Sequence, residues 1–154
     1  MYQALRQHLI ALLRGGQAFV PLEHALDGLP FALLNQRPGP LPHSVWELTE
    51  HLRIAQQDII EFSLNPTYVS PAWPEGYWPD QPCAGPSEWR RTCDLVLEER
   101  DRMIKLAEGP DTDLFTPFAH GNGQTLLREI MLVAEHHAYH TGQIILVRRA
   151  MGAW

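Results

Sequence analysis

Three histidines lie close together near the C-terminal end of the chain. The segment EHHAYHTGQI, residues 135–144, places His136, His137 and His140 within five positions. Residues four apart in a helix share one face and lie about one turn from each other, so the imidazoles of His136 and His140 can reach the same metal ion. Histidine pairs at this spacing are typical of metal sites carried by helices. The segment therefore predicts two ligands of a metal site, and a third must come from elsewhere in the chain.

His51 is the candidate third ligand. It lies between Leu48 and Ala55 on the apolar side of an earlier predicted helix. Helix bundles commonly build metal sites from side chains on facing helices, so this position suits a ligand. Three histidines would leave coordination positions open to water or substrate, which is the arrangement that a catalytic ion requires.

Spacing alone leaves two other interpretations open. The apolar stripe of the last predicted helix is centred nearer to His137 than to His136, so His137 and His140 form a rival pair. Histidines beside an apolar stripe also often form ordinary hydrogen bonds in a core or on a solvated face, without any metal.

The hydrophobic pattern predicts four long helices that carry these residues. They are expected over residues 5–13, from Ser44 to about residue 62, from Ser87 to Gly109, and from about Gln124 to Met151. Residues 19–40 mix short apolar pieces with Gly and Pro, and predict one or two short helical turns. Because no segment shows the alternation typical of strands, we expect an all-α, antiparallel four-helix bundle that forms one domain over residues 1–154.

The second helix has the clearest start. Ser44 followed by Glu47 is a capping box, in which each side chain satisfies a backbone N–H of the other residue. Glu47 also precedes His51 by four positions, so it is a candidate hydrogen-bond acceptor for that ring or an additional metal ligand.

The segment between the second and third helices, residues 65–86, is rich in proline and aromatic residues. Six prolines exclude a helix interior, and the aromatic residues Tyr68, Trp73, Tyr77 and Trp78 are too many for a solvated linker. Long irregular segments inside a domain are usually lids, binding loops or interfaces. We therefore expect this segment to form a wall or lid over the open coordination positions, or a dimer contact in which Trp154 takes part.

Composition excludes several classes of protein. The chain has 154 residues, a formal net charge of −6 and no cluster of Lys and Arg, so it lacks the basic patch that nucleic acids require. No apolar run reaches the roughly 18 residues of a membrane-spanning helix, and the N-terminal segment lacks the pattern of a signal peptide. Two cysteines, Cys83 and Cys93, are too few for a disulfide framework. We expect a cytoplasmic protein that binds neither membranes nor nucleic acids.

Two motifs together resemble a known family. HHAYHTGQI reads His-x-x-x-His-x-Gly-Gln from His136 to Gln143, and HSVWELTEHL places His51 on a helix some 85 residues earlier. These motifs, with the order of elements along nearly the whole chain, are similar to the DinB-like superfamily of four-helix-bundle metalloproteins, whose members include bacillithiol S-transferases and mycothiol-dependent maleylpyruvate isomerase. The resemblance implies that His51, His136 and His140 are the three metal ligands and that His137 is a neighbour.

The resemblance also implies a function. It points to a divalent metal ion, with zinc or nickel ahead of iron or cobalt, and to a metal-dependent transferase that joins a low-molecular-weight thiol to a small electrophile. Such an enzyme needs no cysteine of its own, and relatives are often homodimers. The alternatives are a non-catalytic, stress-related metal-binding protein, which a fourth ligand from Glu47 or His137 would favour, and a metal-dependent hydrolase.

Several other residues are weaker candidates near the site. Gln143 can hydrogen-bond a ligand ring or a neighbouring helix, and Gly142 is expected to allow a close approach near the site or at a helix crossing. Tyr139 and His43 are candidates for a substrate contact, and His120 is a candidate for the mouth of the site.

Overall fold

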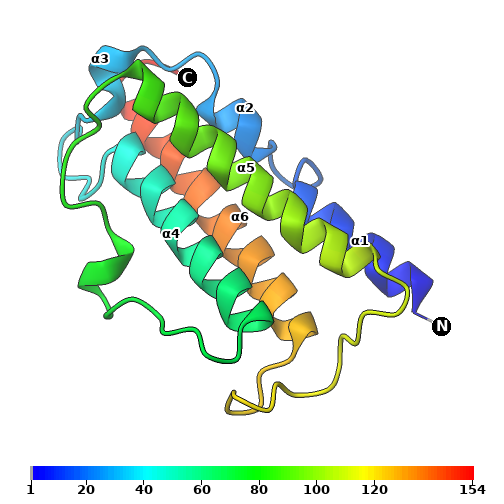
Figure 1. The fold of residues 1–154 in the computed structure, drawn as a ribbon. Helices are drawn as coiled ribbons and strands as arrows, with labels where there is room; N and C mark the ends of the chain where they lie inside the picture. Colours follow the sequence, from blue (N-terminus) through cyan, green and yellow to red (C-terminus); the bar gives the residue numbers. More distant parts are fainter. Residues whose placement is uncertain (1) are drawn as a thin grey trace.

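The computed structural model describes residues 2–154, and this part of the chain is helical without strands. The helices are α1 (Gln3–Arg14), α2 (Leu22–Leu26), α3 (Phe31–Leu34), α4 (Val45–Leu64), α5 (Pro86–Glu108) and α6 (Leu126–Ala150), with one 3-10 turn, η1 (Glu75–Tyr77). The four long helices pack into a bundle, and α2 and α3 lie at one end of it (Figure 1). The predicted all-α bundle is confirmed, as are the short helical turns between the first two long helices.

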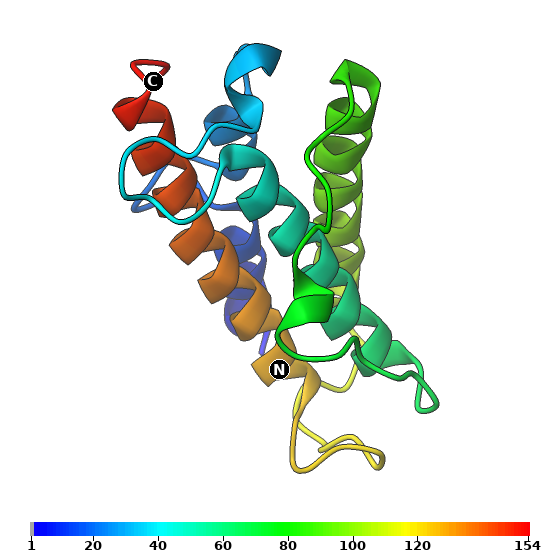
Figure 2. The same cartoon turned by 90° about the vertical axis from the view of Figure 1, so that its left-hand side faces the viewer.

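The long helices are not all antiparallel to their neighbours. α4 packs against α5 and α6, and α1 packs against the same two helices. Figures 1 and 2 show that α4 and α5 run in the same direction, whereas α1 and α6 run in the opposite one. The simple antiparallel arrangement expected from the sequence is therefore wrong for two packed pairs, α4 with α5 and α1 with α6.

The parallel pair explains the length of residues 65–85. A helix of 20 residues such as α4 is about 30 Å long. The chain must return along that length before α5 can start in the same direction, and in Figure 2 the segment climbs beside α4 from the end of that helix to the start of α5. A short turn cannot make this connection.

Local signals place the helix ends as the chemistry of caps requires. The Ser44 side chain accepts a hydrogen bond from the Glu47 backbone N–H at 3.2 Å, and the Glu47 carboxylate accepts one from the Ser44 N–H at 2.8 Å, which completes the predicted capping box. α5 begins one residue earlier than expected, at Pro86, because proline suits the first helical position, where its missing N–H has no partner to lose.

The core consists of two apolar clusters with polar residues between them. One cluster includes Leu48 and Ile144, and the other includes Ile60 and Val133. On α6 the buried residues between these clusters are His137, His140 and Thr141. A polar layer therefore crosses the middle of the bundle. Among residues 2–154, none of the helices combines the length and apolar composition that crossing a bilayer requires.

Candidate metal centre

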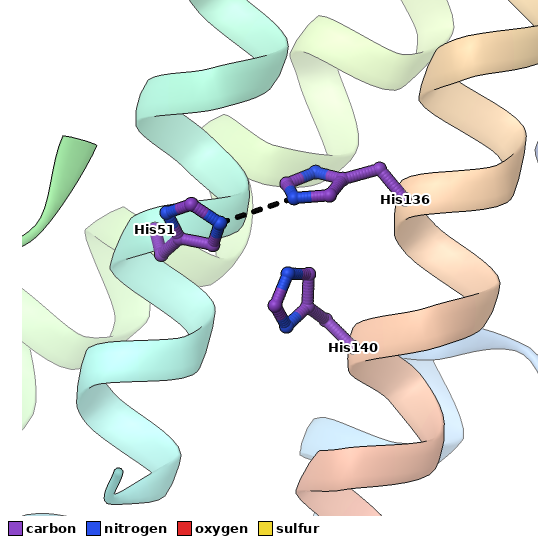
Figure 3. A group of neighbouring side chains, drawn as sticks. All are labelled: His51, His136 and His140. Carbon is purple, nitrogen blue, oxygen red and sulfur yellow. Dashed lines mark hydrogen bonds between the residues drawn. The ribbon is translucent and has the colours of Figure 1, made fainter. Parts of the chain in front are cut away.

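Three imidazoles converge in the interior between α4 and α6. His51 comes from α4, and His136 and His140 come from successive turns of α6 (Figure 3). One nitrogen of each ring lies within 4.8 Å of the corresponding atoms of the other two, and the Nε2 atoms of His51 and His136 are 3.1 Å apart. His51 and His140 are buried, and His136 is half-buried. The structure thus brings together the three side chains that the sequence analysis named.

The rings meet edge to face rather than stacked. Ring centroids are 4.4 Å apart for His136 and His140, and 4.8 and 4.9 Å from His51 to His140 and His136. The angles between ring planes lie between 73° and 86°. Rings inclined in this way can direct their nitrogen lone pairs to a common point.

Outer hydrogen bonds orient two of the rings. Nδ1 of His51 donates to the backbone carbonyl oxygen of Tyr77 at 2.8 Å, and Nδ1 of His140 donates to Oε1 of Gln143 at 2.7 Å. An acceptor at Nδ1 requires the proton on that nitrogen, so Nε2 of each neutral ring carries a free lone pair. Histidine ligands of metal ions are usually held by such outer acceptors.

Burial keeps the imidazoles neutral. Burial first, and then the nearby histidines, lower the pKa of His136 to about 3 and that of His140 to about 4. Burial also lowers the pKa of His51 below its usual value. At neutral pH the three rings are therefore in the form that binds metal ions.

The geometry fits a metal ion of ordinary size. Nitrogens about 2.0–2.1 Å from one ion, with an angle of about 90–110° between the bonds, lie about 2.8–3.4 Å apart. The 3.1 Å between Nε2 of His51 and Nε2 of His136 falls in this range. Without a metal ion, Nε2–H of His136 donates a hydrogen bond to Nε2 of His51, whose own proton is on Nδ1 (Figure 3); a bound ion would take the place of that proton.

An aromatic stack covers one side of the cluster. The Trp78 indole lies between two imidazoles, 4.1 Å from His51 at an angle of 8° and 4.1 Å from His43 at an angle of 13°. Tyr77, the preceding residue, also donates from its hydroxyl to Asp58 Oδ2 at 2.8 Å. The segment 65–85 therefore contacts α4 at His51 and again at Asp58, about two turns later. Trp73 of the same segment is 75% exposed and contacts Tyr77, so only part of the segment packs on the site.

His137 points away from the cluster. It is buried, and it lines a small cavity together with Leu13 of α1 and Arg100 of α5, on another side of α6. Its Nε2 has no hydrogen-bond partner among the described residues. The rival pair of His137 and His140 therefore does not share a site in this structure, and the apolar stripe centred near His137 reflects its place in the core.

The other candidates have separate roles. Glu47 forms the capping box and pairs with Arg37, so its carboxylate is engaged away from the imidazoles. His120 is exposed and donates from Nε2 to the Phe62 carbonyl oxygen at 2.8 Å, near the far end of α4 from the cap. Tyr139 contacts the ring of His140, with centroids 4.9 Å apart, and is 63% exposed.

Gly142 does not have the expected packing role. A Cβ built at this position meets no heavy atom within 4 Å among the described residues. The expectation that Gly142 allows a close approach near the site or at a helix crossing is therefore wrong within this chain, because its face of α6 is exposed.

A separate pocket opens on another side of α4. It has a volume of about 420 Å³ and lies between α4 and α5, where Glu50, Arg53 and Arg91 line it. None of the three converging histidines is among its lining residues. Its charged lining and the absence of the three imidazoles from its walls separate it from the candidate metal centre.

Sequence reasoning missed the Tyr77 carbonyl as a partner of His51. Any residue offers a carbonyl oxygen, so no residue type at position 77 signals this contact. Trp78 was expected in a wall over the site, but its position between His43 and His51 depends on the path of the segment and has no counterpart in local spacing.

Comparison with known proteins identifies one family. The family described as the DinB superfamily matches residues 16–144, a range that holds all three converging histidines and most of the bundle. Comparisons with curated proteins and with solved structures gave no match. The match spans well over half of the chain and agrees with the helical fold and the histidine motif, so this protein belongs to the DinB superfamily.

Proposed function

We propose that this protein binds a divalent metal ion through His51, His136 and His140 and acts as a metal-dependent transferase for a low-molecular-weight thiol and a small electrophile. The observation that supports it most is the convergence of three neutral imidazoles, two of which are oriented by hydrogen bonds from Nδ1. Histidines that only pack in a core would not need ring nitrogens that face one common position.

The donor set limits the choice of metal. Three neutral imidazoles suit zinc, nickel, iron and cobalt, and the order of intrinsic affinities does not choose among them in a cell. We propose zinc or nickel as the resident ion. When bound, such an ion would supply Lewis acidity, which lowers the pKa of a thiol or water that joins it.

The site has features of an open centre. Among residues 2–154, no fourth His, Cys, Asp or Glu joins the three histidines in one cluster. Glu47 and His137, the two residues that were considered as additional ligands, have their contacts elsewhere. A structural zinc site is usually closed by four protein ligands, so this arrangement favours a catalytic role over the alternative of a non-catalytic, stress-related metal-binding protein.

The protein's own cysteines are poor nucleophiles. Burial raises the pKa of Cys93 to about 12 and raises that of Cys83 above its usual value. The thiolate is the reactive form of a thiol, so neither side chain supplies it at neutral pH. A thiol transferase built on this chain therefore needs a small thiol from solution.

The same open site suits a second reaction, and the surface of the chain suits a dimer. A metal-dependent hydrolase is the alternative enzyme, because an open site can also receive water. We further propose a homodimer, for which the exposed side chains of Val69, Trp73 and Trp154 offer apolar surface. Neither metal identity nor subunit number is needed for the test of the site itself.

Metal analysis followed by thiol titration tests the proposed function. Protein purified without a metal-binding tag should contain about one divalent ion per chain. After substitution with cobalt, a small thiol should produce a new thiolate-to-metal absorption band. Stoichiometric metal without this band would refute the thiol chemistry, and the absence of metal together with failure to bind added cobalt would refute the site.

A further inference from the structure

We infer that a small apolar cavity beside the histidine cluster binds a short aliphatic group of the substrate. The cavity has a volume of about 60 Å³. Its apolar walls come from the segment before α4, from α4 and from the last turns of α6, and they are formed by Leu41, Pro42, Leu48, Leu146 and Val147. This inference rests on the proposed function, since it names a part of the substrate that the same site would receive.

Two polar side chains connect the cavity to the cluster. Gln143 lines the cavity and accepts the hydrogen bond from Nδ1 of His140. His43 also lines it and stacks on Trp78, whose other face covers His51. Gln143 therefore contacts a ring of the proposed metal site directly, and His43 reaches one through the Trp78 indole. A molecule with its head at the imidazoles and its tail in the cavity would lie along the interface of α4 and α6.

The positions along the helices support this placement. Leu48 precedes His51 by three residues, and Val147 follows His140 by seven, so each lies on the same face of its helix as the histidine. α4 and α6 run in opposite directions (Figure 2), so one direction leads from His51 to Leu48 and from His140 to Val147. The cavity is thus the next space along the helix pair, toward the start of α4.

Size and charge define the group. A water molecule occupies about 30 Å³ in the liquid, so the cavity has room for about two groups of methylene size. None of its seven lining residues is Asp, Glu, Lys or Arg. A charged group would lose its hydration there without a partner, whereas a short alkyl group would gain from leaving water.

Two homologous series of probes test the cavity on the metal-loaded protein. The first is acetate to hexanoate, and the second is ethanethiol to hexanethiol. Binding is followed by NMR of the methyl groups of Leu41, Leu146 and Val147 in the zinc-loaded chain. We expect these methyl signals to shift and the affinity to rise about fourfold per methylene. The gain should end once about two carbons fill the cavity. Equal affinity along both series, or shifts that avoid these methyl groups, would overturn the inference.

The two series separate this inference from the proposed function. If alkyl carboxylates show the chain-length dependence but thiols give no thiolate-to-cobalt band, the cavity stands and the thiol chemistry fails. If the thiols give the band with the same affinity at every length, the thiol chemistry stands and the cavity fails. A dependence on chain length in both series, together with the band, supports both.

A pair of matched variants locates the effect. Leu146 lines the cavity and is 54% exposed, and Met131 lies earlier on the same helix and is 53% exposed. Leu146→Gln should remove most of the gain per methylene and leave the metal content unchanged, whereas Met131→Gln should keep the full gain. An unchanged gain in Leu146→Gln, or an equal loss in both variants, would overturn the assignment of the cavity.

Discussion

The ring of His140 is held by Gln143, three residues later on the same helix. Nδ1 of His140 lies 2.7 Å from Oε1 of Gln143, so the side-chain amide fixes which nitrogen of the ring carries the proton. The two residues belong to the same His-x-Gly-Gln end of the motif. Gln143 is therefore a positioning residue, since it acts on the proposed metal site through His140.

Loss of this acceptor should weaken metal binding. Gln143→Ala is expected to lower the affinity for zinc about 10-fold to 100-fold, because removal of an outer acceptor leaves the ligand ring free to turn or to change tautomer. Competition with a chelator of known affinity measures the change. Gln143→Glu keeps an acceptor oxygen at the same position and serves as the matched control, which should retain most of the affinity. Equal losses in both variants would contradict the positioning role.

Substitution of the three converging histidines should release the metal, and substitution of their neighbour should not. His51→Ala, His136→Ala and His140→Ala are each expected to lose most of the bound ion, measured by elemental analysis after dialysis. His137→Ala should keep it, because the His137 ring faces Arg100 and the core, although the variant should be less stable. Glu47→Gln should also retain the ion. Metal retention in all three alanine variants of the converging set would refute these ligands. Loss of the metal ion in Glu47→Gln would identify Glu47 as a fourth ligand.

Metal binding should be visible in the fluorescence of one tryptophan. The Trp78 indole lies 4.1 Å from the His51 ring, so cobalt or nickel bound at that ring is expected to quench its emission. The quenching should disappear in Trp78→Phe and persist in Trp73→Phe, whose indole is 75% exposed in the same segment. Titration of the metal-free protein with cobalt, followed by emission, makes this measurement. Unaltered quenching in Trp78→Phe would mean that the ion lies elsewhere.

The metal-free protein should lose stability as the pH falls. Histidines in the unfolded chain titrate near their usual value of 6.5, whereas burial holds the pKa of His136 at about 3 and that of His140 at about 4. Between these values the unfolded chain binds more protons than the folded chain. The free energy of unfolding is therefore expected to be highest above about pH 6.5 and to fall progressively toward about pH 4.

Urea unfolding after chelator treatment tests this expectation between about pH 7.5 and 4.5. His136→Gln should show a shallower decline than the unmodified chain, because it removes one of the depressed histidines. His8→Gln, at an exposed position of α1, is the control and should leave the slope unchanged. The same slope in all three proteins would show that other groups cause the decline.

Local patterns predicted the elements and the converging residues well, for physical reasons that can be named. The Ser44 and Glu47 cap depends on atoms three residues apart, and the pair of His136 and His140 depends on one helical turn, so both follow from short-range geometry. His51 could be named because its apolar neighbours fix which side of the helix faces the core. The ligand role of the three residues stays a prediction.

Other features depend on contacts that the sequence does not encode locally. The parallel direction of α4 and α5 follows from the course of residues 65–85, whose composition excludes a helix but does not give a direction. The hydrogen bond from His51 to the Tyr77 carbonyl oxygen joins residues 26 positions apart, and its acceptor is a backbone atom that every residue type carries. Gly142 resembled a packing glycine, but its environment is open, because the need for a small residue depends on a partner surface rather than on spacing.

The separation of His51 from His136 along the chain has a consequence for folding. The two rings come from positions 85 residues apart, so an ion held by both would close a loop of that length. Closing a loop of that length costs the unfolded chain entropy, so the ion should bind the folded chain in strong preference. An ion that binds only the folded chain stabilises it in proportion to the logarithm of the free metal concentration. The proposed metal would thus act as a reversible cross-link between the first and last thirds of the chain. During folding, tight metal binding would begin only after α6 has packed against α4.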